Sequence, residues 1–512
     1  MKKIILPILL FCATLSINAQ EYMHINSHWY ENYIPVEDID SISYGELSYQ
    51  QMLPAIMAKD PSISLFNQAL ELTHLSDSLL EEYDYSYQGE RGVLFPGFQS
   101  QRLCVLPEKR KGYTAFVEPD SVYAKHGINN IEDLKAYAAR VYNEMYPEDA
   151  GITDPTDRRN SLNRFVSYHI LPIKAGKDNM TLAGMYDRRN NIAMIEKFVP
   201  GYNISDWHET MMPHSLMKCT TPYNKRGARF INRCGTGDLL RSDTTNIEGA
   251  EIINTNAALN GYCHYINDII AYDKHTQTVV LDEQIIIDEA ILTPEIINNN
   301  LRLNMNYSQP SGVYSNGIYL SYCTLKNFNI YSSSTQIYYL YSYGWANFQS
   351  DEMLVLGNFD FSIKLPSVPA GTYELNMGCS ASSYRPIFVC YLNEEFCDTI
   401  DARDESAGNK KWELWRSDKE LRTPEKIAQN DSLLFVNGYR KGLPNYYGGS
   451  YGGGQTTMRD GYMCMRPIIT TFTTDGKSDY YLRFKSVDSN PRKEFHLDFL
   501  ELTPTHLLKE YK

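Results

Sequence analysis

Residues 162–172 read Leu-Asn-Arg-Phe-Val-Ser-Tyr-His-Ile-Leu-Pro. Four of them recur at the i, i+3, i+4, i+7 spacing of one helix face: Leu162, Phe165, Val166 and His169. We therefore expect a helix that turns this face towards a core. A histidine on such a stripe is expected to be buried and hydrogen-bonded, so His169 and its neighbour Tyr168 are predicted to be structural residues.

Further helix and strand signals lie on both sides of this stretch. Upstream, Asp60 and Pro61 are suited to the first positions of a helix. A second helix is expected after Asn130. Downstream, the pair Asn260-Gly261 stands between two extended segments, which is a strong hairpin signal. Helical and strand patterns thus alternate from residue 60 to about residue 273.

The remainder of the chain is dominated by short strands and turns. Strands are expected near residues 359–365, 372–377, 386–392, 480–484 and 495–502. The last of these has apolar residues at every second position, Phe495, Leu497 and Phe499. The intervening His496 and Asp498 make it a half-buried strand. Repeated short strands of this kind indicate a sandwich or jelly roll, and the fold class is predicted to be α+β with several domains.

Residues 1–19 have the order of a secretory signal peptide. Two lysines precede a short apolar stretch, and Ala19 is the small residue after which cleavage is expected. Lipidation at Cys12 is the alternative, which the bulky residue before it and the short apolar stretch disfavour. Residues 20–59 are polar and irregular, and are interpreted as an N-terminal leading segment.

Charge and cysteine usage exclude some classes of partner. The formal net charge is −14, which argues against nucleic acid because nucleic-acid binding needs a concentrated basic patch. No stretch after residue 19 is long and apolar enough to cross a bilayer. The ten cysteines have no zinc or redox spacing. Cys390 and Cys397 could bridge a hairpin, and free buried thiols are the other expectation.

Motifs for catalysis or cofactor binding are missing from the sequence. Neither H-E-x-x-H nor G-x-S-x-G occurs, and paired carboxylates such as Glu394-Glu395 do not by themselves indicate a glycosidase. His208, Glu209 and His214 could bind zinc, but a spacing of six residues does not stack the two histidines on one helix face. We therefore expect no cofactor, no metal and no enzymatic activity.

A ligand site is expected in a glycine-rich loop, residues 439–462. Tyrosine is unusually frequent in this chain, with 40 residues, and its flat apolar face and hydroxyl suit wet binding surfaces. The residues proposed to bind ligand are Tyr446, Tyr447, Tyr451, Arg459, Asp460, Trp412 and Trp415. Sugar rings would stack on the aromatic faces, and the charged groups would meet hydroxyls. The alternative is a self-packing loop with tryptophans in the core.

The middle of the chain resembles the fasciclin-like domain, a compact α/β unit of adhesion and surface proteins. Four stretches carry the resemblance in the family's order: Phe66 to Leu70, Tyr113 to Asp120, Leu162 to Pro172 around Tyr168-His169, and Asn260 to Ile270 with His264 and Ile266 in register. Asn267 stands where aspartate is usual, and residues 142–158 are an insertion. The resemblance implies a fasciclin-like domain over residues 60–275.

Further stretches are similar to a Bacteroidota type of this family. They include Leu292 to Asn300, Leu365 to Glu374, Arg459 to Met463, and Leu497 to Leu502, the last of which resembles the final strand of galactose-binding-like modules. The resemblance implies a connecting β-rich segment over residues 276–350 and a galactose-binding-like β-sandwich over residues 351–505.

The same resemblance supplies an expected role and place. Proteins of this type accompany SusC/SusD-like outer-membrane uptake systems for glycans or peptides, at the cell surface or in the periplasm. The expected function is therefore non-catalytic binding. Cell adhesion through the fasciclin-like domain is the alternative, followed by a hydrolase with an unrecognised site.

Overall fold

The computed structural model describes residues 22–27, 30–35, 51–87, 102–105, 108–177, 179–181, 186–187, 192–193, 204–222, 227–234, 249–302, 313–320, 325–341, 348–404, 414–443, 447–448, 456–461, 464–487, 490 and 492–508. The chain divides into two compact units, Met1–Glu46 and Leu47–Lys512. The fold is mixed α+β and largely β-sandwich, which confirms the coarse fold class predicted above.

The first unit contains a β-hairpin. Strand β1 (Tyr22–Ser27) pairs antiparallel with β2 (Tyr30–Pro35). The interpretation of residues 20–59 as irregular is wrong here, because tyrosine and isoleucine within these short segments favour strands. It is also wrong at residues 53–58, which form a helix of the second unit.

Helices of the second unit begin at the predicted signals. Asp60 accepts a hydrogen bond from the Ser62 amide and opens a 3₁₀ turn, so the α-helix after it starts at residue 64. Asn130 caps the next long helix by accepting from two backbone amides. The α-helices are α1 (Leu53–Ala58), α2 (Ser64–Leu72), α3 (Asp120–Lys125), α4 (Ile131–Met145), α5 (Ser161–Tyr168), α7 (Glu289–Leu292), α8 (Pro294–Asn298), α9 (Asp418–Leu421) and α10 (Pro424–Phe435). Short 3₁₀ or π turns are η3 (Pro61–Ile63), η4 (Leu75–Leu79), η5 (Pro147–Asp149), η6 (Thr276–Val280), η8 (Phe348–Ser350) and η11 (Thr505–Leu507).

Seven strands form a sheet in the order β5-β4-β12-β11-β10-β9-β8. Their bounds are β4 (Tyr113–Val117), β5 (Ile170–Leu171), β8 (Ile204–Glu209), β9 (Leu216–Thr221), β10 (Phe230–Ile231), β11 (Ala250–Ala258) and β12 (Gly261–Ile266). Strands β4 and β12 pair in parallel, and their other neighbours are antiparallel. Helix α5 ends at Tyr168 and β5 begins at Ile170, so residues 162–172 join the helices to this sheet.

The predicted hairpin at Asn260-Gly261 is confirmed, with its turn one residue earlier. Ala258 pairs with Gly261, which is already the first residue of β12. The Asn260 side chain is fully buried, accepts from the Leu53 amide at 2.9 Å and donates to the Leu79 carbonyl at 2.7 Å. Asn260 therefore ties α1 and η4 to the hairpin.

Three five-stranded sheets make up the β-rich half of the second unit. Their orders are β13-β28-β19-β25-β22, β27-β17-β16-β14-β3 and β15-β18-β26-β20-β21. The strands are β3 (Arg102–Val105), β13 (Ile285–Asp288), β14 (Val313–Leu320), β15 (Phe328–Ile330), β16 (Gln336–Tyr341), β17 (Asp351–Leu356), β18 (Asp360–Lys364), β19 (Gly371–Ser380), β20 (Ile387–Leu392), β21 (Glu395–Asp401), β22 (Tyr439–Lys441), β25 (Cys464–Thr474), β26 (Tyr481–Ser486), β27 (Phe495–Leu497) and β28 (Phe499–Pro504). Two short pairs complete the list, β6 (Tyr186–Asp187) with β7 (Ile192–Ala193) and β23 (Tyr447–Gly448) with β24 (Thr456–Thr457).

Aromatic side chains fill the core of this half. Phe495 of β27 lies 4.8 Å from Phe484 of β26 and 4.9 Å from Phe388 of β20, measured between ring centroids. Phe361 of β18 joins the same group at 5.7 Å. Strands of two different sheets therefore share one buried aromatic cluster.

The predicted half-buried strand at residues 495–502 is wrong in one respect. The strand is interrupted at Asp498, because β27 pairs with β17 whereas β28 pairs with β13 and β19. His496 and Asp498 are both buried, at 4% and 2% exposure. Each polar residue finds partners across the sheets, so both faces of the segment are covered.

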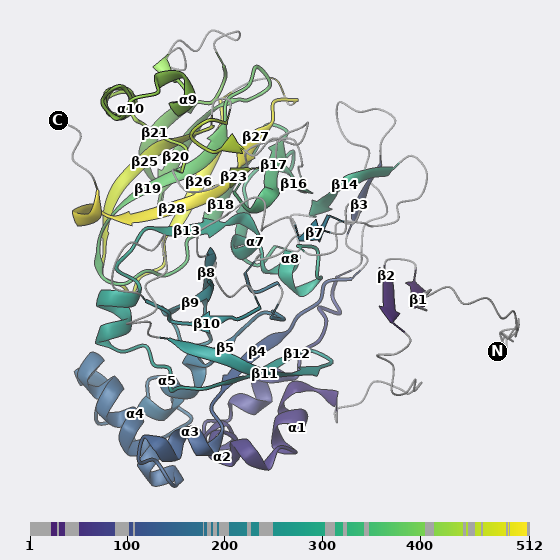
Figure 1. Cartoon of the computed structure of the whole chain (residues 1–512), viewed down its shortest axis with the longest axis vertical. Coiled ribbons are helices and arrows are strands. Elements are labelled where there is room, and N and C mark those ends of the chain that lie inside the picture. The colour runs from purple at the N-terminus through teal and green to yellow at the C-terminus, as the bar shows by residue number, and fades with distance from the viewer. Residues whose placement is uncertain are drawn as a thin grey trace, which may run out of the picture. The chain divides into compact units, whose positions relative to one another are not determined.

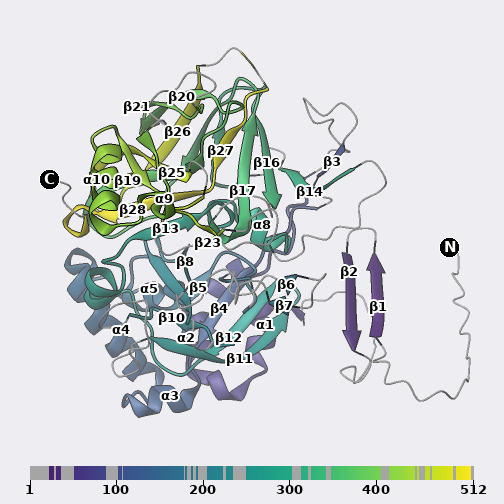
Figure 2. The same cartoon turned by 45° about the horizontal axis from the view of Figure 1, so that its top comes forward.

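Helices lie at both ends of the second unit, with α9 and α10 beside the C-terminal strands (Figures 1 and 2). Helices α1 to α5 lie with the seven-stranded sheet at one end, and the C-terminal strands, from β17 to β28, lie at the other. Strand β8 lies against β13 where the two halves meet. Within the described ranges, no helix has the length and apolarity needed to span a membrane.

Candidate functional site

His169 is fully buried and bonded through both ring nitrogens. Its Nδ1 lies 2.7 Å from the Phe165 carbonyl oxygen, and its Nε2 lies 2.8 Å from Oε1 of Glu118. Glu118 follows β4, is also fully buried, and accepts from the Tyr123 hydroxyl at 2.7 Å. The pair therefore links α5, the end of β4 and α3.

Tyr168 is fully buried beside His169. Its hydroxyl lies 3.1 Å from Oδ1 and 2.9 Å from Nδ2 of Asn232, and burial raises its pKa well above the ordinary tyrosine value. Its ring lies 5.4 Å from that of Tyr272. Neither Tyr168 nor His169 is presented to solvent in this arrangement.

The loop predicted to bind ligand is described in part. Tyr446, Tyr451 and Trp412 lie outside the described residues. Tyr447 is in β23, where it pairs with Thr457 of β24. Trp415 is 9% exposed, and the ammonium of Lys441 lies 6.0 Å from its ring centroid.

The two charged residues of the predicted site contact other protein groups. The guanidinium of Arg459 contacts Asp418 at 2.5 Å and Asp431 at 2.8 Å. Asp460 accepts from the Lys419 amide at 2.9 Å. These bonds attach the β24 segment to α9 and α10.

The histidines near residue 210 are separated by their local structure. His208 is buried on β8 and its Nε2 lies 2.9 Å from the Met180 carbonyl oxygen. His214 has a left-handed backbone conformation, with φ 56°, and its Nδ1 is 3.4 Å from the Ser367 hydroxyl. In the described part of the chain, these residues do not form a group with metal-ligand geometry.

An outward surface of the sheet β15-β18-β26-β20-β21 carries aromatic rings around one arginine. We name Tyr331, Arg483, Tyr391 and Phe396 the arginine–aromatic face. The guanidinium carbon of Arg483 lies 4.3 Å from the ring centroid of Tyr331 and 5.7 Å from that of Tyr391. Tyr391 meets Phe396 edge-on at 6.2 Å. Tyr331 is 49% exposed and Phe396 63%.

Strand register explains why these side chains meet. Arg483 of β26 is paired with Tyr391 of β20 on one side and Ser362 of β18 on the other. Residues paired across strands share a sheet face, while the flanking Leu482 and Phe484 point into the core. The arginine–aromatic face is therefore the solvent side of a sheet whose other side is core.

Carboxylates fix the arginine in the face. Arg483 donates to both carboxylate oxygens of Asp360, at 2.7 and 3.0 Å, and to Glu394 at 2.5 Å. The bonds to Asp360 raise the pKa of Arg483 further above its ordinary value, so it stays charged. The result is a row of rings around a fixed guanidinium, with polar groups at its edge. The amino-acid sequence does not predict this face, because its residues span positions 331 to 483 and no local motif joins them.

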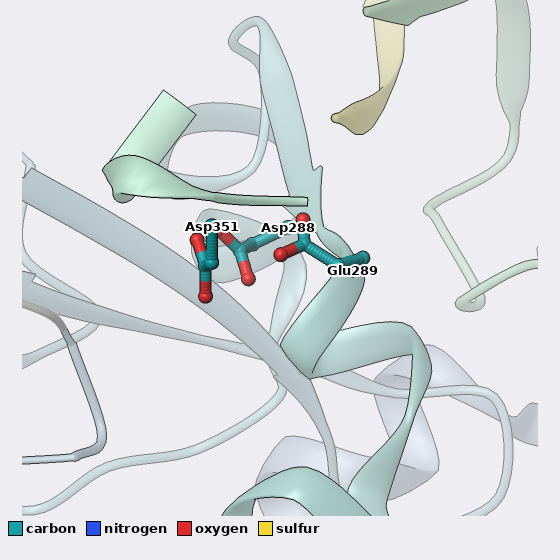
Figure 3. Close-up of side chains that lie close together, drawn as sticks. All are labelled: Asp288, Glu289 and Asp351. Atoms are coloured by element: carbon teal, nitrogen blue, oxygen red, sulfur yellow. The ribbon is translucent and has the colours of Figure 1, made fainter. Parts of the chain in front are cut away.

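A second cluster lies buried where β13, α7 and β17 meet. Asp288, Glu289 and Asp351 are each fully buried, and one carboxylate oxygen from each lies within 4.8 Å of the others. Figure 3 shows the three carboxylates gathered beside one another. We name these three residues the acidic centre.

Each member of the acidic centre is placed by the backbone around it. Asp288 ends β13 and caps α7, with its Oδ1 accepting from the Ala290 amide at 2.9 Å. Glu289 is the first residue of α7. Asp351 begins β17, and its Oδ2 accepts from the Tyr339 hydroxyl at 2.6 Å.

Burial strongly disfavours charge on these carboxyls. It raises the pKa of Asp351 to about 6, and the nearby Arg302 guanidinium opposes that rise. Burial and the neighbouring carboxylates raise the pKa of Asp288 and Glu289 well above their ordinary values. Burial also raises the pKa of Asp498, near the same centre.

Arg302 connects the acidic centre to the seven-stranded sheet. This fully buried guanidinium lies 2.9 Å from Asp206 of β8 and 3.4 Å from Asp288 of β13. Gln349 bonds to both Arg302 and Asp206 at 2.9 Å. The expectation of no metal site did not consider this cluster, because its members are far apart in sequence.

Comparisons with known proteins do not show a family for this chain. No protein-family model and no curated protein matches the chain. Among solved structures, a Paenibacillus xanthan lyase has a TM-score of 0.18 at 9% identity, with 31% of this chain and 11% of that chain covered. A Bacteroides uniformis β-glucuronidase has a TM-score of 0.15 at 12% identity, with 30% and 11% covered. The insecticidal crystal protein Cry2Aa has a TM-score of 0.19 at 9% identity, with 76% and 69% covered. The chain thus spans about a ninth of the length of the first two, and likenesses this distant carry no argument about function.

Proposed function

We propose that the protein is an exported, non-catalytic binding protein of the bacterial envelope that takes a glycan on the arginine–aromatic face. The observation that carries the proposal is the row of rings on this face: the fixed guanidinium of Arg483 lies between Tyr331 and Tyr391, and the exposed Phe396 meets Tyr391. Pyranose rings have apolar C–H faces that stack on aromatic rings. Their hydroxyls need hydrogen-bond partners, which Asp360 and Glu394 offer at the edge of the face.

Two expectations from the sequence support the same role. The first 19 residues have the order of a secretory signal peptide. The resemblance to fasciclin-like and galactose-binding-like modules points to an accessory of a SusC/SusD-like uptake system at the outer membrane. Partners would then be the transporter complex and its glycan.

The test is a double Tyr331→Ala/Phe396→Ala variant of the full mature chain. Tyr331 is half exposed and Phe396 mostly exposed, so the melting temperature should stay within a few degrees of the wild type, about 2–4 °C. Affinity for a glycan identified on an array should fall roughly ten- to hundred-fold, since each lost aromatic contact costs about 1 kcal/mol or more. Tyr384→Ala is the matched control, because Tyr384 is 68% exposed and stands outside this face. Unchanged affinity in the double variant contradicts the proposal.

The glycine-rich loop is the competing location, and a second variant separates the two. Triple substitution Tyr446/Tyr447/Tyr451→Ala should leave both stability and glycan affinity close to wild type if the face binds the ligand. Loss of affinity in the triple variant alone would place the site in the loop. Cell or matrix binding that survives both variants would favour adhesion, and turnover of a polysaccharide would favour a hydrolase.

A further inference from the structure

We propose that the acidic centre binds one divalent cation, Ca²⁺ in preference to Mg²⁺, and that this ion joins β13 and α7 to β17. The proposal is independent of the glycan-binding face. It concerns a different part of the molecule, because Asp288, Glu289 and Asp351 are fully buried.

The first argument is the supply of unpartnered oxygen atoms. Within the described residues, Oδ2 of Asp288, Oδ1 of Asp351 and both carboxylate oxygens of Glu289 are buried and accept no hydrogen bond. Buried polar atoms in native proteins almost always have partners. Among the described residues, no N–H or hydroxyl group donates to either oxygen of Glu289, and its side chain reaches towards the other two carboxylates, close enough to Asp351 for the two to share a proton (Figure 3).

The second argument is the balance of charge. Three carboxylates converge here, with oxygens within 4.8 Å of one another. The guanidinium that contacts them, Arg302, lies closest to Asp206 and is 3.4 Å from Asp288. Among the described residues, Glu289 and Asp351 take part in no ion pair with a lysine, arginine or histidine. A divalent ion would allow the three carboxyls to ionise by neutralising their negative charge, and a shared proton between carboxyls is the competing arrangement.

The third argument selects the ion. All of the available ligand atoms are carboxylate oxygens, which suit Ca²⁺ and Mg²⁺ rather than softer metals. Mg²⁺ usually keeps several of its waters, whereas Ca²⁺ accepts six to eight protein oxygens with flexible geometry. The three side chains have no solvent-exposed surface, so an ion that loses its hydration shell readily fits better.

The ion would also have a mechanical consequence. Asp351 begins β17 and Asp288 ends β13, and these strands belong to different five-stranded sheets. Arg302 extends the link to Asp206 on β8 of the seven-stranded sheet. Loss of the ion should therefore loosen the junction at which three sheets meet.

The experiment uses the full mature chain, freed of metal with chelator and dialysed. Calorimetric titration with Ca²⁺ alone should give one site per chain. Saturation with Ca²⁺ should raise the melting temperature by several degrees. Mg²⁺ should bind at least ten-fold more weakly. Tb³⁺ should occupy the same site and emit when tyrosine is excited, because the Tyr339 hydroxyl donates to Asp351.

Two variants and one control make the outcome decisive. Glu289→Gln and Asp351→Asn keep the side-chain shape but remove a charge, so each should abolish the Ca²⁺-dependent rise in melting temperature. Metal-free Glu289→Gln should melt no lower than the metal-free wild type, since it loses repulsion. Glu395→Gln, an exposed carboxylate on β21, should respond to Ca²⁺ like the wild type.

Three results would overturn the proposal. They are no binding of Ca²⁺ or Tb³⁺ at one site per chain, an unchanged melting temperature at saturating Ca²⁺, or a normal Ca²⁺ response in both variants. If neither variant folds, metal analysis of wild-type protein purified without chelator decides. About one calcium per chain supports the site, and none overturns it.

Discussion

Replacing His169 with alanine should destabilise the protein strongly, because two kinds of interaction disappear together. The imidazole lies 4.4 Å from the ring of Phe165 and 5.5 Å from that of Phe66, so its loss leaves a cavity in the core. The substitution also removes the imidazole Nε2 that lies 2.8 Å from Oε1 of Glu118, and this carboxylate oxygen is fully buried. Breaking one side of such a buried pair costs about 3–5 kcal/mol of unfolding free energy.

The helix stripe alone predicts a smaller loss. From sequence, a buried hydrogen-bonded histidine suggests a cost of about 1–3 kcal/mol. The buried Glu118 raises that figure to about 3–5 kcal/mol, since losing the imidazole leaves a buried carboxyl with the Tyr123 hydroxyl and the Ile270 amide as its donors and no charged partner. Urea unfolding of wild type and His169→Ala, followed by circular dichroism, measures the difference directly.

A double-mutant cycle isolates the pair from the packing. Glu118→Gln keeps an acceptor for the Tyr123 hydroxyl and removes the charge. In the double variant His169→Ala/Glu118→Gln the carboxyl that lost its imidazole partner is also replaced by a neutral amide, so the loss of stability should be about 1.5–3 kcal/mol smaller than the sum of the single losses. Strict additivity, or a His169→Ala loss below about 1 kcal/mol, would refute the reasoning. A variant that melts normally yet loses partner binding would instead make His169 a functional residue.

Three further predictions follow from other parts of the molecule. Burial lowers the pKa of His264 from 6.5 to about 4, so the unfolded chain binds more protons than the folded chain between these pH values. The free energy of unfolding should therefore fall by about 3 kcal/mol on account of this residue as the pH drops from about 6.5 to 4. Urea unfolding of the wild type and of His264→Asn at each pH measures this contribution as the difference between the two proteins. Gly261→Ala should cost several kcal/mol, because the added carbon would lie 2.1 Å from the Tyr113 carbonyl oxygen. Gly127→Ala is its control, because Gly127 has open space around it and differs from other positions only in its positive φ of 76°. This variant should lose about 1 kcal/mol of unfolding free energy, measured by thermal or urea unfolding. Intact-mass analysis of protein from the native envelope should give Gln20 as the first residue, and an acylated mass would contradict this.

Much of the fold could be predicted from local patterns. Asp60 and Asn130 mark helix starts through side-chain acceptors, and the stripe ending at His169 defines α5. Asn260-Gly261 marks the hairpin of β11 and β12, although the Asn260 side chain turned out to hold distant backbone groups. These features depend on residues within one turn or hairpin of each other, so periodicity and capping chemistry reveal them.

The candidate sites could not be predicted in this way. The arginine–aromatic face needs the pairing of Arg483 with Tyr391, and the acidic centre brings Asp351 to Asp288 from 63 positions further along the chain. By itself the sequence determined where helices and short strands form, because backbone preference and side-chain spacing act over a few residues. Only the tertiary structure decided which strands are neighbours, and in which register. That pairing sets which distant charges share a buried space and which rings share an exposed face, and no local pattern records it.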